Sequence, residues 1–362
     1  MRHRTSADRQ RRPVHRHLRR TGMGVVSAIF AVILMLTTAA HLSGMDNLPD
    51  GASRNEAAPY HGPQGGVGLR VATFNIRLSC LPADTQTRSW AIRATNVINE
   101  IKKANPDVIG IQEASNNRTA EDKGLMPQAN HDDPKCVVGI GESSQLTDFA
   151  SRLAKIGYHE APAEGGERIS DHIFYNGSTV EATTTPAVLY ALHGGDAYLT
   201  VATLKMKNPE SHNFAFATTH LIDPGQTPDP SDVTDCNSTI TLETQEAMGL
   251  LNSYYRSDPV IFAGDFNSPQ TGTCTSYAKV TTGNNHTVRA LYDAQIHSLA
   301  VNDNYQTTNG WKAPVISHTA LDYRYDRIFV SDDITVASWV NQLPTVIGQT
   351  SDHNLIYADV FI

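Results

Sequence analysis

Short hydrophobic runs that are rich in β-branched and aromatic residues recur from residue 69 to the end of the chain. Several of them alternate with polar positions, and both features predict β-strands. The predicted strands are Leu69–Ile76, Val108–Gln112, His172–Tyr175, Tyr198–Lys205, Asn213–His220, Pro259–Ala263, Asp326–Val330, Thr335–Val340 and Leu355–Phe361.

Three longer segments carry hydrophobic residues at helical spacing. They are Ser89–Lys103, Leu146–Ile156 and Thr241–Tyr255. In the first, the apolar residues expected on one side are Ile92, Val97, Ile98 and Ile101, and Asn105-Pro106 ends the helix. Strands that alternate with a few helices predict an α/β domain with mixed sheets. Two long polar insertions, 116–143 and 223–237, are predicted to be loops.

The first 43 residues are typical of a targeting segment. Met1–Arg20 carries eight arginines and one acid, and Gly22–Ala40 carries no charge. This order indicates a secretory signal, with an uncleaved anchor as the alternative because the apolar stretch approaches the ~20 residues that span a bilayer. We therefore expect a protein that is secreted, or anchored to the membrane with its main domain extracellular. Residues 44–68 are predicted to be a flexible linker, and residues 69–362 one domain.

Removing the leader makes the chain strongly acidic. The full chain has 29 Lys and Arg against 37 Asp and Glu, so without the leader's eight and one the counts are 21 against 36, or −15 for residues 41–362. Such a protein gains nothing from counterion release on nucleic-acid phosphates unless a metal or a local basic patch intervenes. The charge counts against tight passive binding of nucleic acid, but not against hydrolysis of a phosphoester with a bound cation.

Polar residues stand repeatedly at the ends of the hydrophobic strands. If these ends converge, the polar side chains meet in one cleft. The residues concerned are Asn75, Glu113, His220, Asp265 and Asn267, Asp326, and Asp352 with His353. Each has a plain alternative, since any one of them could form a turn, cap a turn or make a surface ion pair. Six such coincidences together favour a site.

The chemistry that this set supports is metal-assisted hydrolysis of a phosphoester. A hard cation such as Mg²⁺ takes oxygen ligands, which Glu113, Asp352 and Asn75 can supply. Hydrolysis also needs a base for water and an acid for the leaving oxygen, roles open to His220, His353 and Asp265.

The four cysteines lie in the part predicted to be exported. An even number outside the cytosol predicts two disulfides, with three connectivities open. If the strand ends converge, the cysteines lie at the rim of one cleft, and the sequentially nearest pairing needs the least rearrangement. We therefore expect the disulfides Cys80–Cys136 and Cys236–Cys274.

The ordered motifs "FNIR", "QE", "GDFN", "YDRI" and "TSDH" resemble the endonuclease/exonuclease/phosphatase superfamily across about residues 69–362. Among them, "FNIR", "YDRI" and "TSDH" are most similar to its secreted deoxyribonuclease I branch. The resemblance implies an α/β four-layer sandwich, in which two packed mixed β-sheets are flanked by helices. It further implies a metal-dependent phosphoester hydrolase.

The resemblance also assigns roles to residues. Glu113 matches the principal metal carboxylate, and Asn75 and Asp352 match residues that complete or support the metal site. Arg77 follows Asn75 and is expected to contact substrate, with a surface ion pair as the alternative.

The remaining matches concern water, phosphate and protons. Asp265 and Asn267 match the pair that orients the attacking water and the scissile phosphate. His220 and His353 match the histidines that contact phosphate and move protons. Asp326 matches the acid that holds an imidazole in the right tautomer.

One family feature is missing. Many relatives place a phosphate-contacting tyrosine where this chain reads "ERISDHIFYN", with Ser170, Asp171 and His172 first and Tyr175 later. The tyrosine role therefore has no assigned residue.

The expected protein is a monomeric nuclease without an obligate protein partner, using Mg²⁺, with Mn²⁺ or Ca²⁺ as alternatives. Its alternatives are a phosphoesterase acting on a phospholipid, as sphingomyelinases do, or on a small phosphate ester, and a non-catalytic binding module.

Overall fold

The structure, a computed structural model, describes residues 67–79, 88–114, 144–164, 169–183, 187–209, 211–222, 235–283, 288–314, 316 and 324–362. The chain divides into two units, Met1–Ala52 and Ser53–Ile362, and every described residue lies in the second. The predicted leader, Cys80, Cys136 and nearly all of both long loops lie outside the described residues. No helix within the described ranges is long and apolar enough to cross a membrane.

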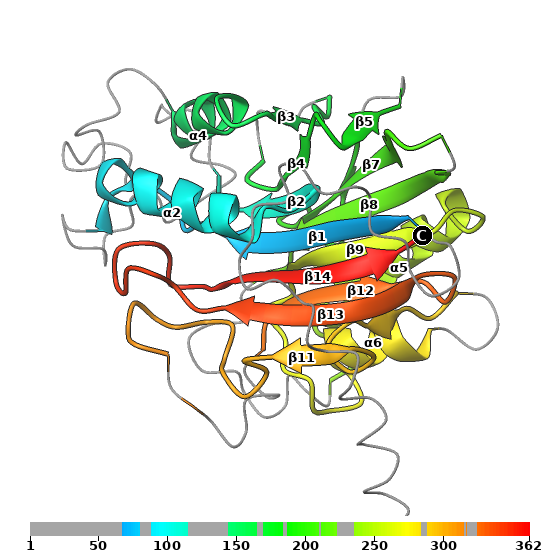
Figure 1. Ribbon diagram of the computed structural model, residues 1–362. Coiled ribbons are helices and arrows are strands. Elements are labelled where there is room, and N and C mark those ends of the chain that lie inside the picture. The colour runs from blue at the N-terminus through cyan, green and yellow to red at the C-terminus, as the bar shows by residue number, and fades with distance from the viewer. Residues whose placement is uncertain are drawn as a thin grey trace, which may run out of the picture. The chain divides into compact units, whose positions relative to one another are not determined.

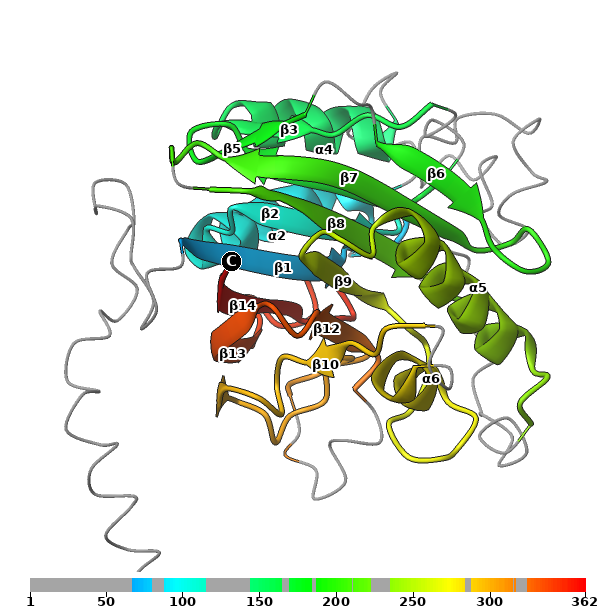
Figure 2. The ribbon, with the colours of Figure 1, turned by 90° about the vertical axis from the view of Figure 1, so that its right-hand side faces the viewer.

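Two seven-stranded mixed sheets form the centre of the second unit (Figures 1 and 2). In order across the first sheet, the strands are β11 (Leu299–Val301), β13 (Thr335–Gln342), β14 (Leu355–Phe361), β1 (Gly68–Asn75), β2 (Val108–Gln112), β4 (His172–Asn176) and β3 (Tyr158–Glu160). Across the second sheet they are β10 (Tyr292–Asp293), β12 (Asp326–Val330), β9 (Val260–Asp265), β8 (Asn213–His220), β7 (Tyr198–Met206) and β5 (Val180–Ala182), with β6 (Val188–Ala191) also paired to β7.

The sheets face each other across one hydrophobic core and carry helices on their outer sides, which makes the four-layer sandwich that the resemblance implied. Val71 and Ile356 from the first sheet and Phe216 and Ile261 from the second belong to this central core. The outer side of the first sheet packs on α2 (Trp90–Ala104) and α4 (Gln145–Ala154). The outer side of the second packs on α5 (Thr239–Tyr254) and α6 (Ser276–Thr282), as Figure 2 shows.

Helix α2 illustrates how the sequence sets these layers. Val97, Ile98 and Ile101 are buried against the first sheet, as their spacing predicts, but Ile92 is 45% exposed and does not belong to that side. The helix ends at Asn105, which adopts the left-handed conformation common after a last helical turn.

The predicted long strands and helices are all present, with ends shifted by a few residues. The domain also begins slightly earlier than predicted, because Val67 exchanges backbone hydrogen bonds with Ile362 and Gly68 pairs with Phe361. The last residues of the predicted linker therefore belong to the first sheet.

The strand registers bring the predicted polar residues together. In the first sheet the parallel strands β1 and β2 pair Asn75 with Gln112, immediately before Glu113. In the second, parallel pairing places His220 beside Asp265, and antiparallel pairing places Asp326 on the other side of Asp265. Because parallel strands end at the same edge of a sheet, the polar strand ends form one cluster.

A disulfide joins Cys236, just before α5, to Cys274, just before α6, with the Cα atoms 4.7 Å apart. This is the second of the two expected pairings.

Candidate active site

The polar cluster contains three non-glycine residues with left-handed backbones. They are Arg77 (φ 62°), Glu113 (φ 61°) and Asn267 (φ 43°). Such conformations cost free energy and concentrate at functional sites. Glu113 directly follows β2, and Asn267 lies two residues after the end of β9, so each turn residue also carries one of the clustered polar side chains.

Asn75 joins the two sheets at the centre of the cluster. Its Nδ2 donates to Glu113 Oε1 at 2.8 Å and to Asp265 Oδ2 at 3.0 Å. Its Oδ1 accepts from the backbone N–H of Arg77 at 3.0 Å. These partners fix the amide orientation, so the Asn75 side chain points its nitrogen, not the oxygen expected of a metal ligand, at the carboxylates. In this arrangement Asn75 supports the site by spacing Glu113 from Asp265.

The Glu113 carboxylate is buried and held ionised. Its second oxygen, Oε2, accepts from the Leu78 N–H at 2.9 Å. Burial acts to raise the pKa of Glu113, but His220, Arg77 and these hydrogen bonds outweigh it and lower the pKa. Each Glu113 oxygen thus accepts one hydrogen bond from Asn75 or Leu78 and keeps a lone pair for another partner.

Asp352 lies near Glu113 and pairs with Arg77. The Arg77 Nη1 is 3.2 Å from Asp352 Oδ2. Burial raises the pKa of Asp352, and the Glu113 carboxylate adds to this effect against the opposing charges of His353 and Arg77. Arg77 is therefore engaged with a site carboxylate, while a contact with substrate stays a prediction.

The His353 imidazole is anchored by a buried acid. Its Nδ1 is 2.9 Å from Asp326 Oδ2 and 3.7 Å from Asp265 Oδ2. Despite burial, which lowers it, the pKa of His353 is raised well above its ordinary value by these two carboxylates. An Nδ1–H donated to Asp326 fixes the tautomer and leaves Nε2 to take up or release a proton.

Asn267 orients the second histidine. Its Nδ2 donates to the Leu221 carbonyl at 2.9 Å and lies 3.0 Å from His220 Nε2. The Asp265 Oδ1 accepts from the Asn267 N–H at 3.0 Å and closes the turn. Asp265 Oδ2 lies 3.6 Å from His220 Nε2 and is the acceptor available when that imidazole is protonated. Burial opposes protonation of His220, yet the surrounding carboxylates raise its pKa.

A further acid, Asp171, contacts the cluster, although the sequence pattern predicts no role for it. Its Oδ2 accepts from the backbone N–H of His220 at 3.2 Å, and burial raises its pKa to about 6. Tyr175, by contrast, pairs with Val108 at the far end of β2 and lies over His159. The tyrosine role therefore stays unassigned. The sequence signal for Asp171 is the "SDH" of residues 170–172 at the start of β4, which repeats the "SDH" of residues 351–353.

The donor set fits a divalent cation. Four carboxylates, those of Glu113, Asp265, Asp326 and Asp352, gather here against the fixed charge of Arg77, and hard cations prefer such oxygen ligands. Among the described residues, Asp265, Asp326 and His353 form a group whose possible ligand atoms lie within 4.8 Å of one another. Because His353 Nδ1 faces Asp326 as a hydrogen-bond donor, the carboxylates of Glu113 and Asp352 fit the cation better.

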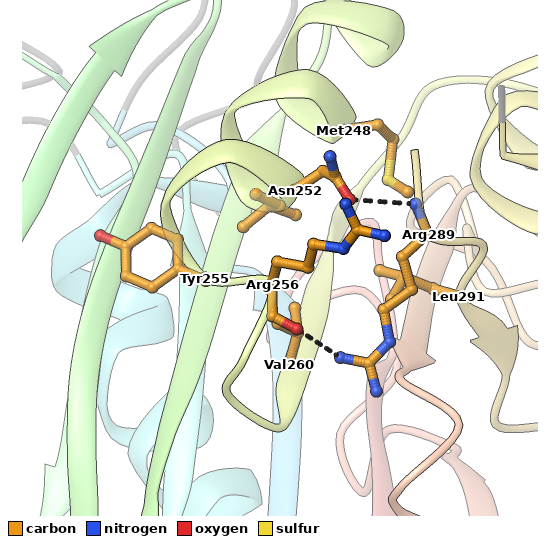
Figure 3. A pocket seen from close by; sticks show the side chains of 8 residues that line it. Met248, Asn252, Tyr255, Arg256, Val260, Arg289 and Leu291 are labelled. Atoms are coloured by element: carbon orange, nitrogen blue, oxygen red, sulfur yellow. Dashed lines mark hydrogen bonds between the residues drawn. The ribbon is translucent and has the colours of Figure 1, made fainter. Parts of the chain in front are cut away.

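A small pocket lies at the opposite end of β9 (Figure 3). Val260, which begins β9, lines it together with Asn252 from the last turn of α5 and Arg256, two residues after that helix ends. Arg289 crosses it, donating from its backbone N–H to Asn252 Oδ1 at 3.2 Å and from Nη1 to the Arg256 carbonyl at 3.3 Å. This pocket is separate from the polar cluster, which lies at the Asp265 end.

Solved structures share this fold. The chain is similar to an endonuclease/exonuclease/phosphatase from Bacteroides vulgatus (19% identity, 82% of this chain and 99% of that chain, TM-score 0.57). It is also similar to a mannosyl-6-phosphatase from Bacteroides thetaiotaomicron (19%, 81% and 100%, 0.56) and to the human nocturnin catalytic domain (17%, 82% and 95%, 0.50). A search among curated proteins gave no match.

The sequence itself matches a family model over residues 72–353, a range that contains Asn75 near one end and His353 at the other. Members of this family are phosphoester hydrolases, and enzymes with this fold generally depend on a divalent metal. The chain therefore belongs to the endonuclease/exonuclease/phosphatase family.

Proposed function

We propose that the protein is an exported, divalent-metal-dependent phosphodiesterase, and specifically a monomeric nuclease that hydrolyses nucleic-acid phosphodiesters by in-line attack of water. The observation that carries this proposal is that the Asn75 amide donates to both Glu113 and Asp265 and so joins the polar ends of the two sheets. His220 lies beside them, with its Nε2 3.6 Å from Asp265 Oδ2. The deoxyribonuclease-like motifs and the signal-like first 43 residues support the nuclease and its export.

The residues divide the chemical work as follows. Glu113 and Asp352 would hold the cation, which supplies charge stabilisation at the phosphoryl oxygens. Asp265 and Asn267 orient the attacking water and the phosphate, and the Asn267 amide is already fixed by the Leu221 carbonyl. His353, with Nδ1 bound to Asp326, presents Nε2 for proton transfer. Magnesium is the proposed metal, with Mn²⁺ or Ca²⁺ as alternatives.

A phosphoesterase acting on a phospholipid or a small phosphate ester is the second candidate. One structural neighbour is a mannosyl-6-phosphatase, and the chain without its leader has a net charge of −15. An acidic surface repels polyanions at long range but does not disfavour a small ester that reaches the metal.

One experiment separates the candidates. The purified domain, with Mg²⁺, is incubated in parallel with plasmid DNA, RNA, sphingomyelin vesicles, p-nitrophenyl phosphate and bis-p-nitrophenyl phosphate. Cleavage of nucleic acid and of the diester, with the lipid and the monoester spared, supports the nuclease. Cleavage of the lipid or the monoester alone selects the second candidate.

The matched control is Glu113→Gln, which keeps the side-chain shape but removes the charge that would hold the cation. Activity that survives this change unaltered comes from a contaminant or from another site, and would refute the assignment. Both proteins are purified in the same way and assayed side by side, so that a contaminating hydrolase would be present in both preparations.

A further inference from the structure

Arg93 is a buried cation on helix α2. It lies on the inner side of α2 with 0% exposure, among Trp90, Ala94 and Val97. A charged residue on the apolar side of a helix is rarely fully buried without dedicated partners.

All five N–H groups of this guanidinium donate to backbone carbonyls. Nε donates to the Arg88 carbonyl at 2.5 Å. Nη1 donates to Ile76 at 2.6 Å and to Thr350 at 3.0 Å. Nη2 donates to Arg77 at 3.0 Å and to Leu78 at 2.9 Å. Since a guanidinium has five N–H groups in a rigid planar fork, these contacts use its full capacity.

The rings of two tryptophans complete the surroundings. The guanidinium carbon of Arg93 lies 5.7 Å from the centre of the Trp90 ring and 5.4 Å from that of Trp311. Both distances are within the range of cation–π attraction. Aromatic rings and carbonyls together therefore replace water around this charge.

The bonded carbonyls belong to the segments that carry the proposed cation site. Residues 76–78 follow Asn75, and the N–H of Leu78 holds Glu113 Oε2 at 2.9 Å. Thr350, whose carbonyl accepts from Arg93 Nη1, precedes Asp352 by two residues. Arg93 thus links the segment that orients Glu113 to the segment that carries Asp352, in addition to the Arg77–Asp352 ion pair.

We propose that Arg93 is a positioning residue for the cation site, which fixes the separation of Glu113 and Asp352 before the metal binds. This inference rests on the proposed metal dependence but does not depend on the substrate. Residues that orient metal ligands without touching the metal typically change its affinity by about 10- to 100-fold when replaced.

The test is direct Mn²⁺ binding, measured by calorimetry without substrate on purified domains carrying Arg93→Lys or Arg93→Met. We expect about 10-fold weaker binding for Arg93→Lys, which keeps the charge but not the planar fork, and about 100-fold for Arg93→Met. The control is Arg70→Lys, at the opposite end of β1, where Arg70 pairs with Asp359 and stacks on Tyr357; its Mn²⁺ affinity should stay within twofold of the wild type. A folded Arg93→Met protein with wild-type affinity would overturn the proposal.

A measurement on the wild-type protein covers the case in which Arg93 variants do not fold. If Arg93 fixes the two segments beforehand, amide hydrogen exchange of residues 76–78 and 350–352 is equally slow without and with Mn²⁺. Protection that arises only after Mn²⁺ is added would refute the inference, and so would a wild-type protein that binds no Mn²⁺. A protein that binds Mn²⁺ but cleaves no phosphoester would refute only the proposed function.

Discussion

Replacing Glu243 by glutamine should remove a loss of stability that the wild-type protein undergoes between about pH 5 and pH 8. Glu243 lies on α5 with 0% exposure. Its Oε2 accepts from the Ile222 N–H at 3.0 Å, whereas Oε1 has no hydrogen-bond partner within the described part of the chain. A carboxylate in such surroundings is costly in its ionised form.

The size of the effect follows from the pKa of this carboxyl. Burial raises the pKa of Glu243 from 4.5 to about 7. Between these values the folded protein keeps a proton that the unfolded chain releases, so the free energy of unfolding falls as the pH rises. The stabilising contribution of the neutral acid is complete below pH 4.5 and is lost above about pH 7. The two pKa values differ by about 2.5, and a difference of 1 in pKa corresponds to about 1.36 kcal/mol. The free energy of unfolding therefore falls by about 3 kcal/mol across this pH range.

Urea unfolding at a series of pH values measures this loss. The glutamine variant also places an amide nitrogen near the position of Oε1, where no hydrogen-bond partner lies within the described part of the chain. This unsatisfied group lowers the stability by about 1–3 kcal/mol at every pH. The quantity to compare is therefore the change in unfolding free energy from pH 5 to pH 8. Glu246→Gln, an exposed position on the same helix, is the control and should follow the wild type. If Glu243→Gln and the wild type lose stability in parallel, the reasoning is wrong.

Three further predictions concern the site and its rim. Glu113→Gln and His353→Ala should each lower kcat by about 10²–10⁴-fold with an unchanged circular dichroism spectrum, because one removes a metal charge and the other a proton carrier; full activity in either folded variant contradicts the assignment. Asp326→Asn should lose less kcat than His353→Ala if Asp326 only orients the imidazole, and an equal loss would mean that it acts directly. Replacing Cys236 and Cys274 together by serine should cost about 4 kcal/mol in urea unfolding, since the disulfide spans a sequence separation of 38; a loss below about 1 kcal/mol would contradict this entropic account.

Most of the fold followed from the hydrophobic pattern because the long strands and helices carry enough positions to show a period. Strands β3, β5 and β11 have three residues each, and β10 has two, so no alternation can be seen in them. The short helix α6, with three threonines or serines among seven residues, likewise has no apolar stripe. These elements form because longer neighbours offer them an edge or a face, which is tertiary information.

The site was predictable to the level of residues but not of atoms. Strand ends in "FN", "QE" and "GDFN" placed Asn75, Glu113 and Asp265 together, and the registers of β1 with β2 and of β8 with β9 explain why. Which end of the Asn75 amide faces the carboxylates depends on the Arg77 backbone, and no sequence pattern carries that orientation. The sequence does not predict that Arg93 is buried, because a single charged residue in a helix is usually exposed. Its burial depends on the backbone carbonyls that accept its hydrogen bonds, which only the structure shows.

The hydrogen bonds between Val67 and Ile362 hold the two ends of the domain side by side, at the end of β1 opposite to Asn75. A linker of a few residues could therefore join these ends, and the chain could be reopened in the exposed turn before β7, at Gly194 and Gly195. Such a circular permutant would keep every strand pairing while reversing which half of the sandwich is synthesised first. Attaching the domain to a surface at Val67 or at Ile362 would also leave the polar cluster, at the opposite end of β1, facing away from the support.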